Sequence, residues 1–152
     1  MHKIAGHVAR DRNKDRSGGR RAKRNAVEKG KELEDFIERI AEEHGWRVEK
    51  RRKYGDRILD LVISKGGTVF IVQSKNTDQA MPSDVSQTRK DFEEYVRWLL
   101  EEKLGISVVP ILVSRSFSDG AKGRARSYGV LLYTVDELES LLAERARARE
   151  DD

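Results

Sequence analysis

Three polar residues interrupt the two most apolar stretches of the chain. Asp60 lies within the stretch 58–63, and Gln73 and Lys75 end the stretch 68–75. A strand interior disfavours aspartate, and a buried charge is costly unless it is paired or binds a metal. Carboxylate and amide oxygens suit Mg²⁺ or Mn²⁺, and a nearby ammonium can stabilise developing negative charge or help to deprotonate water. The residue types therefore predict a divalent-metal site with a lysine beside it.

A turn at Gly66-Gly67 predicts how these residues meet. A two-residue hairpin loop pairs Lys65 with Thr68, so paired residue numbers sum to 133 and Asp60 stands opposite Gln73. Residues two apart on a strand share a face, which adds Lys75 to the same side. A purely structural alternative remains open, in which Lys75 forms a salt bridge with Asp60 at the sheet edge.

The segments around this hairpin are expected to form an α/β fold. Strands are expected at about 46–52, 58–63, 68–75, 106–113 and 130–133, and helices at about 24–45 and 84–103, around Ala121 and Ala125, and after Thr134. The order predicts one mixed sheet with helices on both faces.

Three details refine this expectation. The unbroken apolar run at 68–72 is typical of a central strand covered on both faces. Pro110 cannot donate to a β-ladder, which predicts an edge or a bulge in its strand. Thr134 and Glu137 have the spacing of a capping box for the last helix.

The spacing of these residues resembles the PD-(D/E)xK nuclease superfamily. Asp60, twelve residues, then Gln73-Ser74-Lys75 follows its core pattern, and the glutamine is similar to Mrr-type restriction endonuclease domains. The segment 55–60 and the C-terminal positions 116–118, 121, 125, 129–130 and 136–138 also resemble that branch, over roughly residues 30–142. The resemblance implies a restriction-endonuclease-like αβββαβ core, with a mixed central sheet flanked by helices.

The resemblance also implies an activity, a metal-dependent endodeoxyribonuclease that hydrolyses DNA phosphodiester bonds with Mg²⁺ or Mn²⁺. Asp60, Gln73 and the Ser74 backbone carbonyl would bind the metal. Lys75 would position or activate the attacking water, and Glu34 on the first helix would be a third acid. The family favours homodimers that act on duplex or branched DNA.

Other functions remain open at this stage. Within the same class, the alternative is a Holliday-junction resolvase, because Glu34 and the run Arg20-Arg21-Ala22-Lys23-Arg24 also resemble archaeal resolvases. A different class is a non-catalytic DNA-binding module, which the uncharged Gln73 would suit and an intact Asp60 and Lys75 would not. A protein acting on RNA ranks last, because the chain has no RNA-recognition motif.

Positive charge is concentrated at the N-terminus. Residues 1–31 hold 11 Lys or Arg against 3 Asp or Glu, whereas residues 32–152 hold 20 against 24. Residues 1–21 are predicted to be a disordered basic arm and residues 22–149 a single nuclease domain. Basic arms bind nucleic acid by releasing counterions, so phosphate contacts are expected from Arg20, Arg21, Lys23 and Arg24. A solvated tail is the alternative.

Composition sets further expectations. The chain has no cysteine and no run of 18 apolar residues, which excludes disulfides and predicts no membrane span. A reducing cytoplasm is the expected setting, and the family resemblance places it in a prokaryote or a virus. Asn and Gln occur three times each beside 38% charged residues, a pattern typical of thermophilic proteins.

Deleting residues 1–21 should weaken DNA binding and flatten its salt dependence. The slope of log K against log salt should fall by about 0.9 for each phosphate that the arm neutralises. Binding titrations across a salt series measure this slope for the full chain and the truncated chain. An unchanged slope would mean that the arm makes no phosphate contacts.

Overall fold

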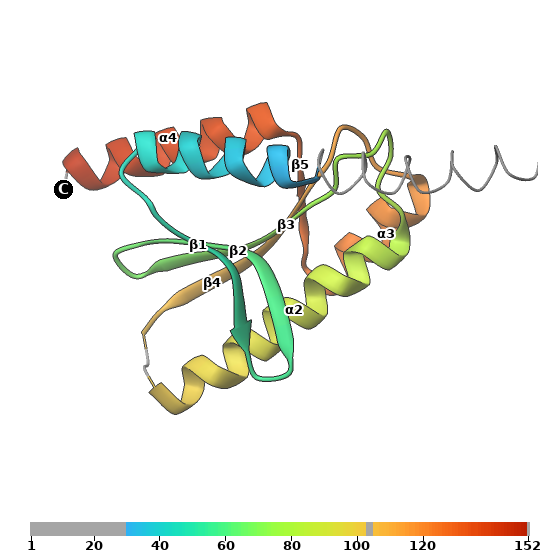
Figure 1. Cartoon of the computed structure of the whole chain (residues 1–152), viewed down its shortest axis with the longest axis horizontal. Helices are drawn as coiled ribbons and strands as arrows, with labels where there is room; N and C mark the ends of the chain where they lie inside the picture. The colour runs from blue at the N-terminus through green and yellow to red at the C-terminus, as the bar shows by residue number, and fades with distance from the viewer. Residues whose placement is uncertain (1–29, 103–104, 152) are drawn as a thin grey trace, which may run out of the picture.

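The computed structural model describes residues 30–102 and 105–151. The predicted arm, its boundary at residue 21 and the cations Arg20, Arg21, Lys23 and Arg24 lie outside these ranges. A helix over residues 30–43 opens the described chain (Figure 1). The elements that follow are β1 (Arg47–Tyr54), β2 (Arg57–Lys65), β3 (Thr68–Ser74), α2 (Pro82–Glu102), β4 (Ser107–Val113), α3 (Asp119–Tyr128), β5 (Leu131–Tyr133) and α4 (Val135–Asp151).

The five strands form one mixed sheet in the order β1-β2-β3-β4-β5. β1, β2 and β3 are antiparallel neighbours, whereas β3, β4 and β5 run parallel. The parallel pairs are joined by α2 and α3, as parallel connections require. The predicted α/β fold with an αβββαβ core is confirmed, and β3 is the central strand, as its apolar run predicts.

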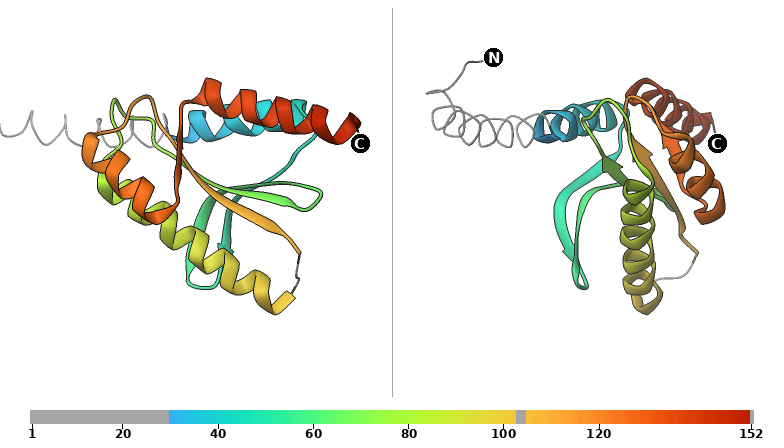
Figure 2. Two further views of the ribbon diagram at one scale, coloured as in Figure 1. Left: turned by 180° about the vertical axis from the view of Figure 1, so that it is seen from behind. Right: turned by 90° about the vertical axis from the view of Figure 1, so that its right-hand side faces the viewer.

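Helices cover both faces of the sheet. The helix 30–43 and α4 lie side by side on one face, and α2 and α3 lie on the other (Figures 1 and 2). Alternate residues of β3 therefore enter different cores, with Phe70 and Val72 in one and Val69 and Ile71 in the other. Trp46 joins the first core to the last helix, because its Nε1–H donates to the Leu142 carbonyl at 3.1 Å.

Local patterns in the sequence predicted the hairpin and the last helix correctly. Lys65 pairs with Thr68, and the β2–β3 pairs sum to 133 from there to Leu61 and Val72. The capping box is also present, since the Thr134 N–H donates to Glu137 Oε1 at 2.9 Å and the Glu137 N–H donates to Thr134 Oγ1 at 3.3 Å.

The Pro110 prediction is only partly right. β4 is not an edge strand, because β3 and β5 flank it. Pro110 pairs with Ile71 of β3, but β5 pairs only with residues 111–113 of β4. Pro110 thus lies beyond the end of β5, where its missing N–H removes no ladder bond.

The turn between β1 and β2 depends on Gly55, which has a φ of 60°. An added Cβ would also collide with the Glu94 side chain of α2. Gly55→Ala should therefore lower the free energy of unfolding by about 1–2 kcal/mol from backbone strain alone, with a further loss from the collision. Urea denaturation measures the change.

Gly105→Ala is the matched control for that variant. Gly105 has a φ of 83° and nothing near its missing Cβ, so it isolates the strain. Adding Glu94→Ala to Gly55→Ala should recover only the part due to collision. A stability equal to the wild type for Gly55→Ala would contradict the proposed strain.

Candidate active site

Asp60 lies where both of the ladders around β2 are interrupted. The β1–β2 register pairs Lys50 with Leu61 and Arg52 with Leu59 but omits Arg51 and Asp60. The β2–β3 ladder ends at Leu61, so the predicted Asp60–Gln73 ladder pair is not formed. Instead, the Ser74 backbone N–H donates to the Asp60 carboxylate. The side chain thus replaces the missing ladder bond where β2 leaves β3.

The electrostatic environment of Asp60 disfavours its negative charge. Burial, followed by the nearby carboxylates of Glu34 and Asp91, raises the pKa of Asp60 to about 6. The Ser74 N–H and the charge of Arg51 act in the opposite direction but do not cancel this shift. Among the described residues Asp60 forms no salt bridge of its own. A cation bound here would therefore relieve repulsion among three acids.

Glu34 is the acid contributed by the first helix. Its side chain is buried, and it accepts hydrogen bonds from Arg51 Nε at 3.0 Å and Arg51 Nη2 at 3.4 Å. Arg51 has a φ of 50°, a left-handed conformation that non-glycine residues rarely adopt. Arg51 lies directly opposite Asp60, at the point where the β1–β2 register is interrupted. The structure therefore brings Glu34 close to Asp60, with the Arg51 guanidinium beside them.

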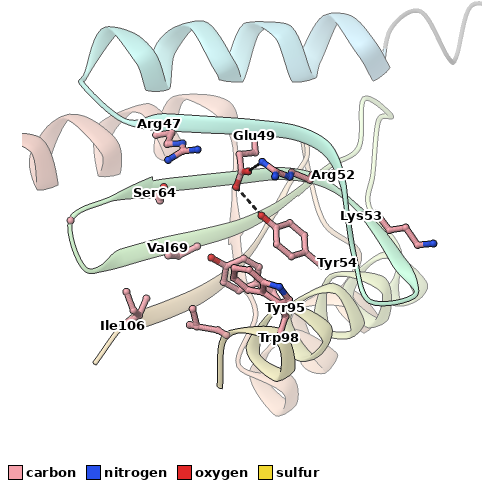
Figure 3. Close-up of a pocket in the computed structure, with 12 residues that line it drawn as sticks. Arg47, Glu49, Arg52, Lys53, Tyr54, Ser64, Val69, Tyr95, Trp98 and Ile106 are labelled. Carbon is pink, nitrogen blue, oxygen red and sulfur yellow. Dashed lines mark hydrogen bonds and ion pairs between the residues drawn. The ribbon is translucent and has the colours of Figure 1, made fainter. Parts of the chain in front are cut away.

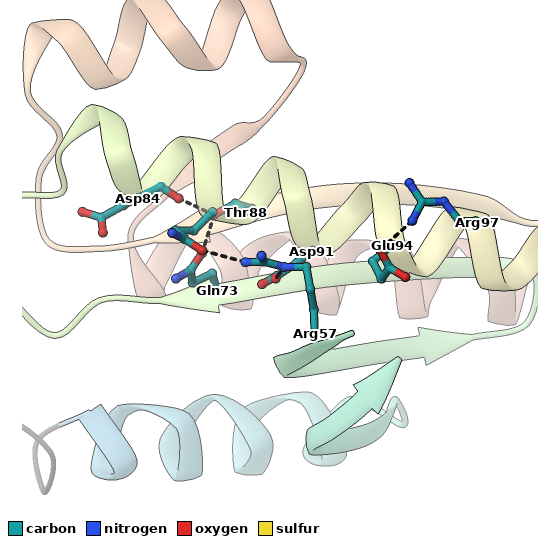
Figure 4. A network of polar contacts seen from close by, with 8 residues as sticks. Arg57, Gln73, Asp84, Thr88, Asp91, Glu94 and Arg97 are labelled. Atoms are coloured by element: carbon teal, nitrogen blue, oxygen red, sulfur yellow. Dashed lines mark hydrogen bonds and ion pairs between the residues drawn. The ribbon is translucent and has the colours of Figure 1, made fainter. Parts of the chain in front are cut away.

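Gln73 and Lys75 are both held by the first turns of α2. The Lys75 ammonium lies 3.4 Å from Asp84 Oδ1, so it does not form the Asp60 salt bridge considered as a structural alternative. The Thr88 hydroxyl lies 3.0 Å from Gln73 Oε1 (Figure 4). Asp84 is fixed in turn by the Met81 N–H, which donates to its Oδ2 at 2.9 Å.

Asp91 continues the same face of α2. It is buried, and Arg57 Nε donates to its Oδ1 at 2.7 Å, while Arg57 Nη2 donates to Gln87 Oε1 at 2.6 Å (Figure 4). Burial raises the pKa of Asp91 despite this ion pair. Arg57 thus tethers the start of β2 to α2.

The donor set fits a hard divalent cation, although it is short of carboxylates. No group of three carboxylate, imidazole or thiol side chains that could hold a metal occurs within the described ranges. Asp60 and Glu34 provide two acids, and the Gln73 amide and Ser74 carbonyl would provide neutral oxygens. The Ser74 hydroxyl is also buried without a hydrogen-bond partner. The arrangement therefore resembles an oxygen-ligand site that has one charge fewer than a full set of acids.

A separate pocket of about 510 Å³ lies between the sheet and the C-terminal half of α2 (Figure 3). Its floor is an aromatic cluster in which Tyr54 meets Tyr95 and Trp98 with ring centroids 5.1 Å apart in both cases. None of the residues predicted for catalysis lines it. The cluster packs the β1–β2 hairpin against α2.

Sequence reasoning missed Arg51, Arg57, Asp84, Thr88 and Asp91 as parts of the site. One signal could have indicated three of them, because Asp84, Thr88 and Asp91 recur at the spacing of a single helix face. The apolar residues of this helix give a less regular signal, because Val85 and Leu99 are buried whereas Phe92 and Val96 are only partly buried.

Comparison with known proteins identifies the family. Residues 26–142 match the Mrr catalytic family of restriction endonucleases, which covers most of the chain. The chain therefore belongs to the restriction endonuclease family, a family of nucleases, as the PD-(D/E)xK motif suggests. No curated protein sequence matches it significantly.

Solved structures support the fold. The AF1548 protein, of unknown function, is 18% identical to this chain with a TM-score of 0.54. The match covers 67% of this chain and 56% of the AF1548 chain. A repair endonuclease from Pyrococcus abyssi is 23% identical to this chain with a TM-score of 0.53. The match covers 66% of this chain and 43% of the endonuclease chain. The chain thus spans about half the length of these two structures. In the described part, no helix is long and apolar enough to cross a membrane.

Asp60→Asn should stabilise the metal-free protein at neutral pH. Because the pKa of Asp60 is raised to about 6 in the fold, the folded state binds a proton that the unfolded chain releases between about pH 4 and 6. The wild type therefore loses stability as pH rises through that interval. The gain from Asp60→Asn should reach about 3 kcal/mol well above pH 6 and should vanish near pH 4.

Denaturation at several pH values with a chelator present measures this difference. Asp56→Asn, in the exposed turn before β2, is the matched control. Equal stability of wild type and Asp60→Asn at pH 7.5 would contradict the crowding of acids around Asp60.

Proposed function

We propose that this chain is a metal-dependent endodeoxyribonuclease that hydrolyses phosphodiester bonds of DNA with Mg²⁺ or Mn²⁺. The observation that carries the proposal is the placement of Asp60. This partly buried carboxylate accepts the N–H of Ser74 at the end of the central strand, beside two further acids, within the segment that matches a nuclease family. Ligands bind at the carboxyl ends of parallel strands in open α/β sheets, and β3 ends there.

The metal would be held by oxygen atoms from three elements. Asp60 would supply a carboxylate, Gln73 an amide oxygen and Ser74 its backbone carbonyl. The Ser74 N–H already points to Asp60, and the N–H and C=O of a paired strand residue face the same neighbour. Glu34 would hold the metal or its waters from the first helix. When bound, the cation supplies Lewis-acid polarisation of a phosphoryl oxygen.

Lys75 would act on the substrate side of the site. Its side chain is 41% exposed, so the ammonium can reach solvent while Asp84 restrains it 3.4 Å away. A positioned ammonium can orient the attacking water and stabilise negative charge that develops on the phosphate. The ion pair with Asp84 would therefore position the Lys75 ammonium and leave it accessible to the substrate.

Substrate binding would extend beyond this centre. Residues 32–152 carry a net negative charge. Most of the affinity for duplex or branched DNA would therefore come from the basic residues near the N-terminus, Arg20, Arg21, Lys23 and Arg24. A homodimer would place two such centres on the two strands of a duplex.

Asp60→Asn and Lys75→Ala should abolish cleavage and leave folding and most DNA binding intact. Cleavage of linear duplex, single strand and four-way junction, with Mg²⁺, Mn²⁺ or chelator, measures activity and separates these substrates. Lys53→Ala, an exposed lysine of β1, is the control for the removal of a positive charge. Metal should also raise the melting temperature of the wild type, because it binds only the folded state.

Gln73→Leu tests the neutral ligand in the same assays. It removes the amide oxygen and should abolish cleavage, whereas cleavage at the wild-type rate would remove Gln73 from the site. If no substrate is cut while DNA is bound regardless of metal, the chain is a binding module and the proposal is wrong. Asp60→Asn cutting at the wild-type rate would refute the assignment of the centre itself.

A further inference from the structure

The Thr88 hydroxyl has two acceptor oxygens within hydrogen-bond distance but only one proton to donate. It lies 3.0 Å from Gln73 Oε1 and 2.9 Å from the Asp84 carbonyl oxygen (Figure 4). A hydroxyl carries one proton and two acceptor lone pairs. The proton can serve both acceptor oxygens only as one shared, weaker bifurcated bond, whereas two full hydrogen bonds require that one of the partners be a donor. Thr88 is 0% exposed, so water cannot resolve this conflict.

The helix favours one assignment of the proton. Thr88 follows Asp84 by four residues on α2, and a helical threonine commonly donates back to the carbonyl four residues earlier. The remaining partner then makes a full hydrogen bond only by donating to Thr88 Oγ1. Gln73 can do so only through its NH₂ group, which requires its amide to be turned over so that Nε2 and Oε1 exchange places.

We propose that Thr88 is the positioning residue that orients the Gln73 amide for metal binding. With Nε2 donating to Thr88 Oγ1, Gln73 Oε1 turns away from α2, where it is free to bind a cation beside Asp60. The inference rests on the proposed metal site. This orientation explains how a neutral amide can replace a carboxylate as a ligand. An amide has one oxygen, so its orientation must be fixed for that oxygen to face the metal. A carboxylate presents an oxygen in either orientation.

A double-mutant cycle with Gln73→Glu tests this role. The probe is Mn²⁺ alone, titrated calorimetrically into the full chain without DNA. Thr88→Val keeps the side-chain shape and removes the hydroxyl, and it should weaken Mn²⁺ binding about 2- to 10-fold, the range that one net hydrogen bond supports. Thr88→Ser should retain wild-type affinity. In the Gln73→Glu background, Thr88→Val should change affinity by less than about 2-fold, because a carboxylate needs no such orientation.

Two further variants keep the result interpretable. Ser86→Ala removes a similar back-bond on α2, from Ser86 Oγ to the Pro82 carbonyl at 3.4 Å, away from Gln73, and should leave Mn²⁺ affinity unchanged. Thr88→Ala repeats the loss of the hydroxyl without a branched replacement, should Thr88→Val fold poorly.

The remaining outcomes overturn the inference in distinguishable ways. Equal weakening by Thr88→Val in the wild type and in the Gln73→Glu variant would mean that Thr88 only supports packing. Unchanged or tighter binding would mean that Gln73 Oε1 faces Thr88 and is not a ligand. A wild type that binds no Mn²⁺ would refute the proposed metal site itself, and the inference with it.

Discussion

The site depends on one carboxylate placed where a β-ladder opens. Asp60 accepts a hydrogen bond from the Ser74 N–H at the point where the β2–β3 ladder has ended, so a side chain takes the place of a backbone carbonyl there. The two neighbouring acids each have an arginine, Glu34 with Arg51 and Asp91 with Arg57, whereas Asp60 has none among the described residues. A negative charge buried without its own partner is costly, and it is this uncompensated charge that makes the position suitable for a cation.

The sheet supplies the strand ends, but α2 decides how the side chains at those ends are oriented. Asp84, Thr88 and Asp91 lie along one face of this helix and contact Lys75, Gln73 and Arg57 respectively. The C-terminal half of α2 packs apolar side chains on the sheet, at Tyr95 and Leu99, whereas its N-terminal half places these polar side chains beside the buried Val85. Stability and site geometry are thus divided between the two halves of one helix.

The glutamine of the motif gives this member of the restriction endonuclease family a particular electrostatic balance. Gln73 carries no charge, yet the pKa of Asp60 is still raised to about 6, because Asp60 is partly buried and Glu34 and Asp91 approach it from two different helices. The negative electrostatic potential at the end of β3 therefore comes from Glu34 and Asp91 as well as from Asp60. In the proposed metal site, a neutral ligand would lower the repulsion among the acids of the metal-free fold, and its single oxygen would have to be oriented by a neighbour.

The sequence by itself determined the features that arise from neighbouring residues. The Gly66-Gly67 turn set the register of β2 and β3, the apolar run identified the central strand, and the spacing from Asp60 to Lys75 indicated the family. Only the tertiary structure decided that the register stops short of Asp60, and that Lys75 pairs with Asp84 rather than with Asp60. Contacts between residues far apart in the chain, such as Glu34 with Arg51 or Gln73 with Thr88, depend on where whole helices lie on the sheet. Packing of the two cores fixes those positions, and no local pattern encodes the result.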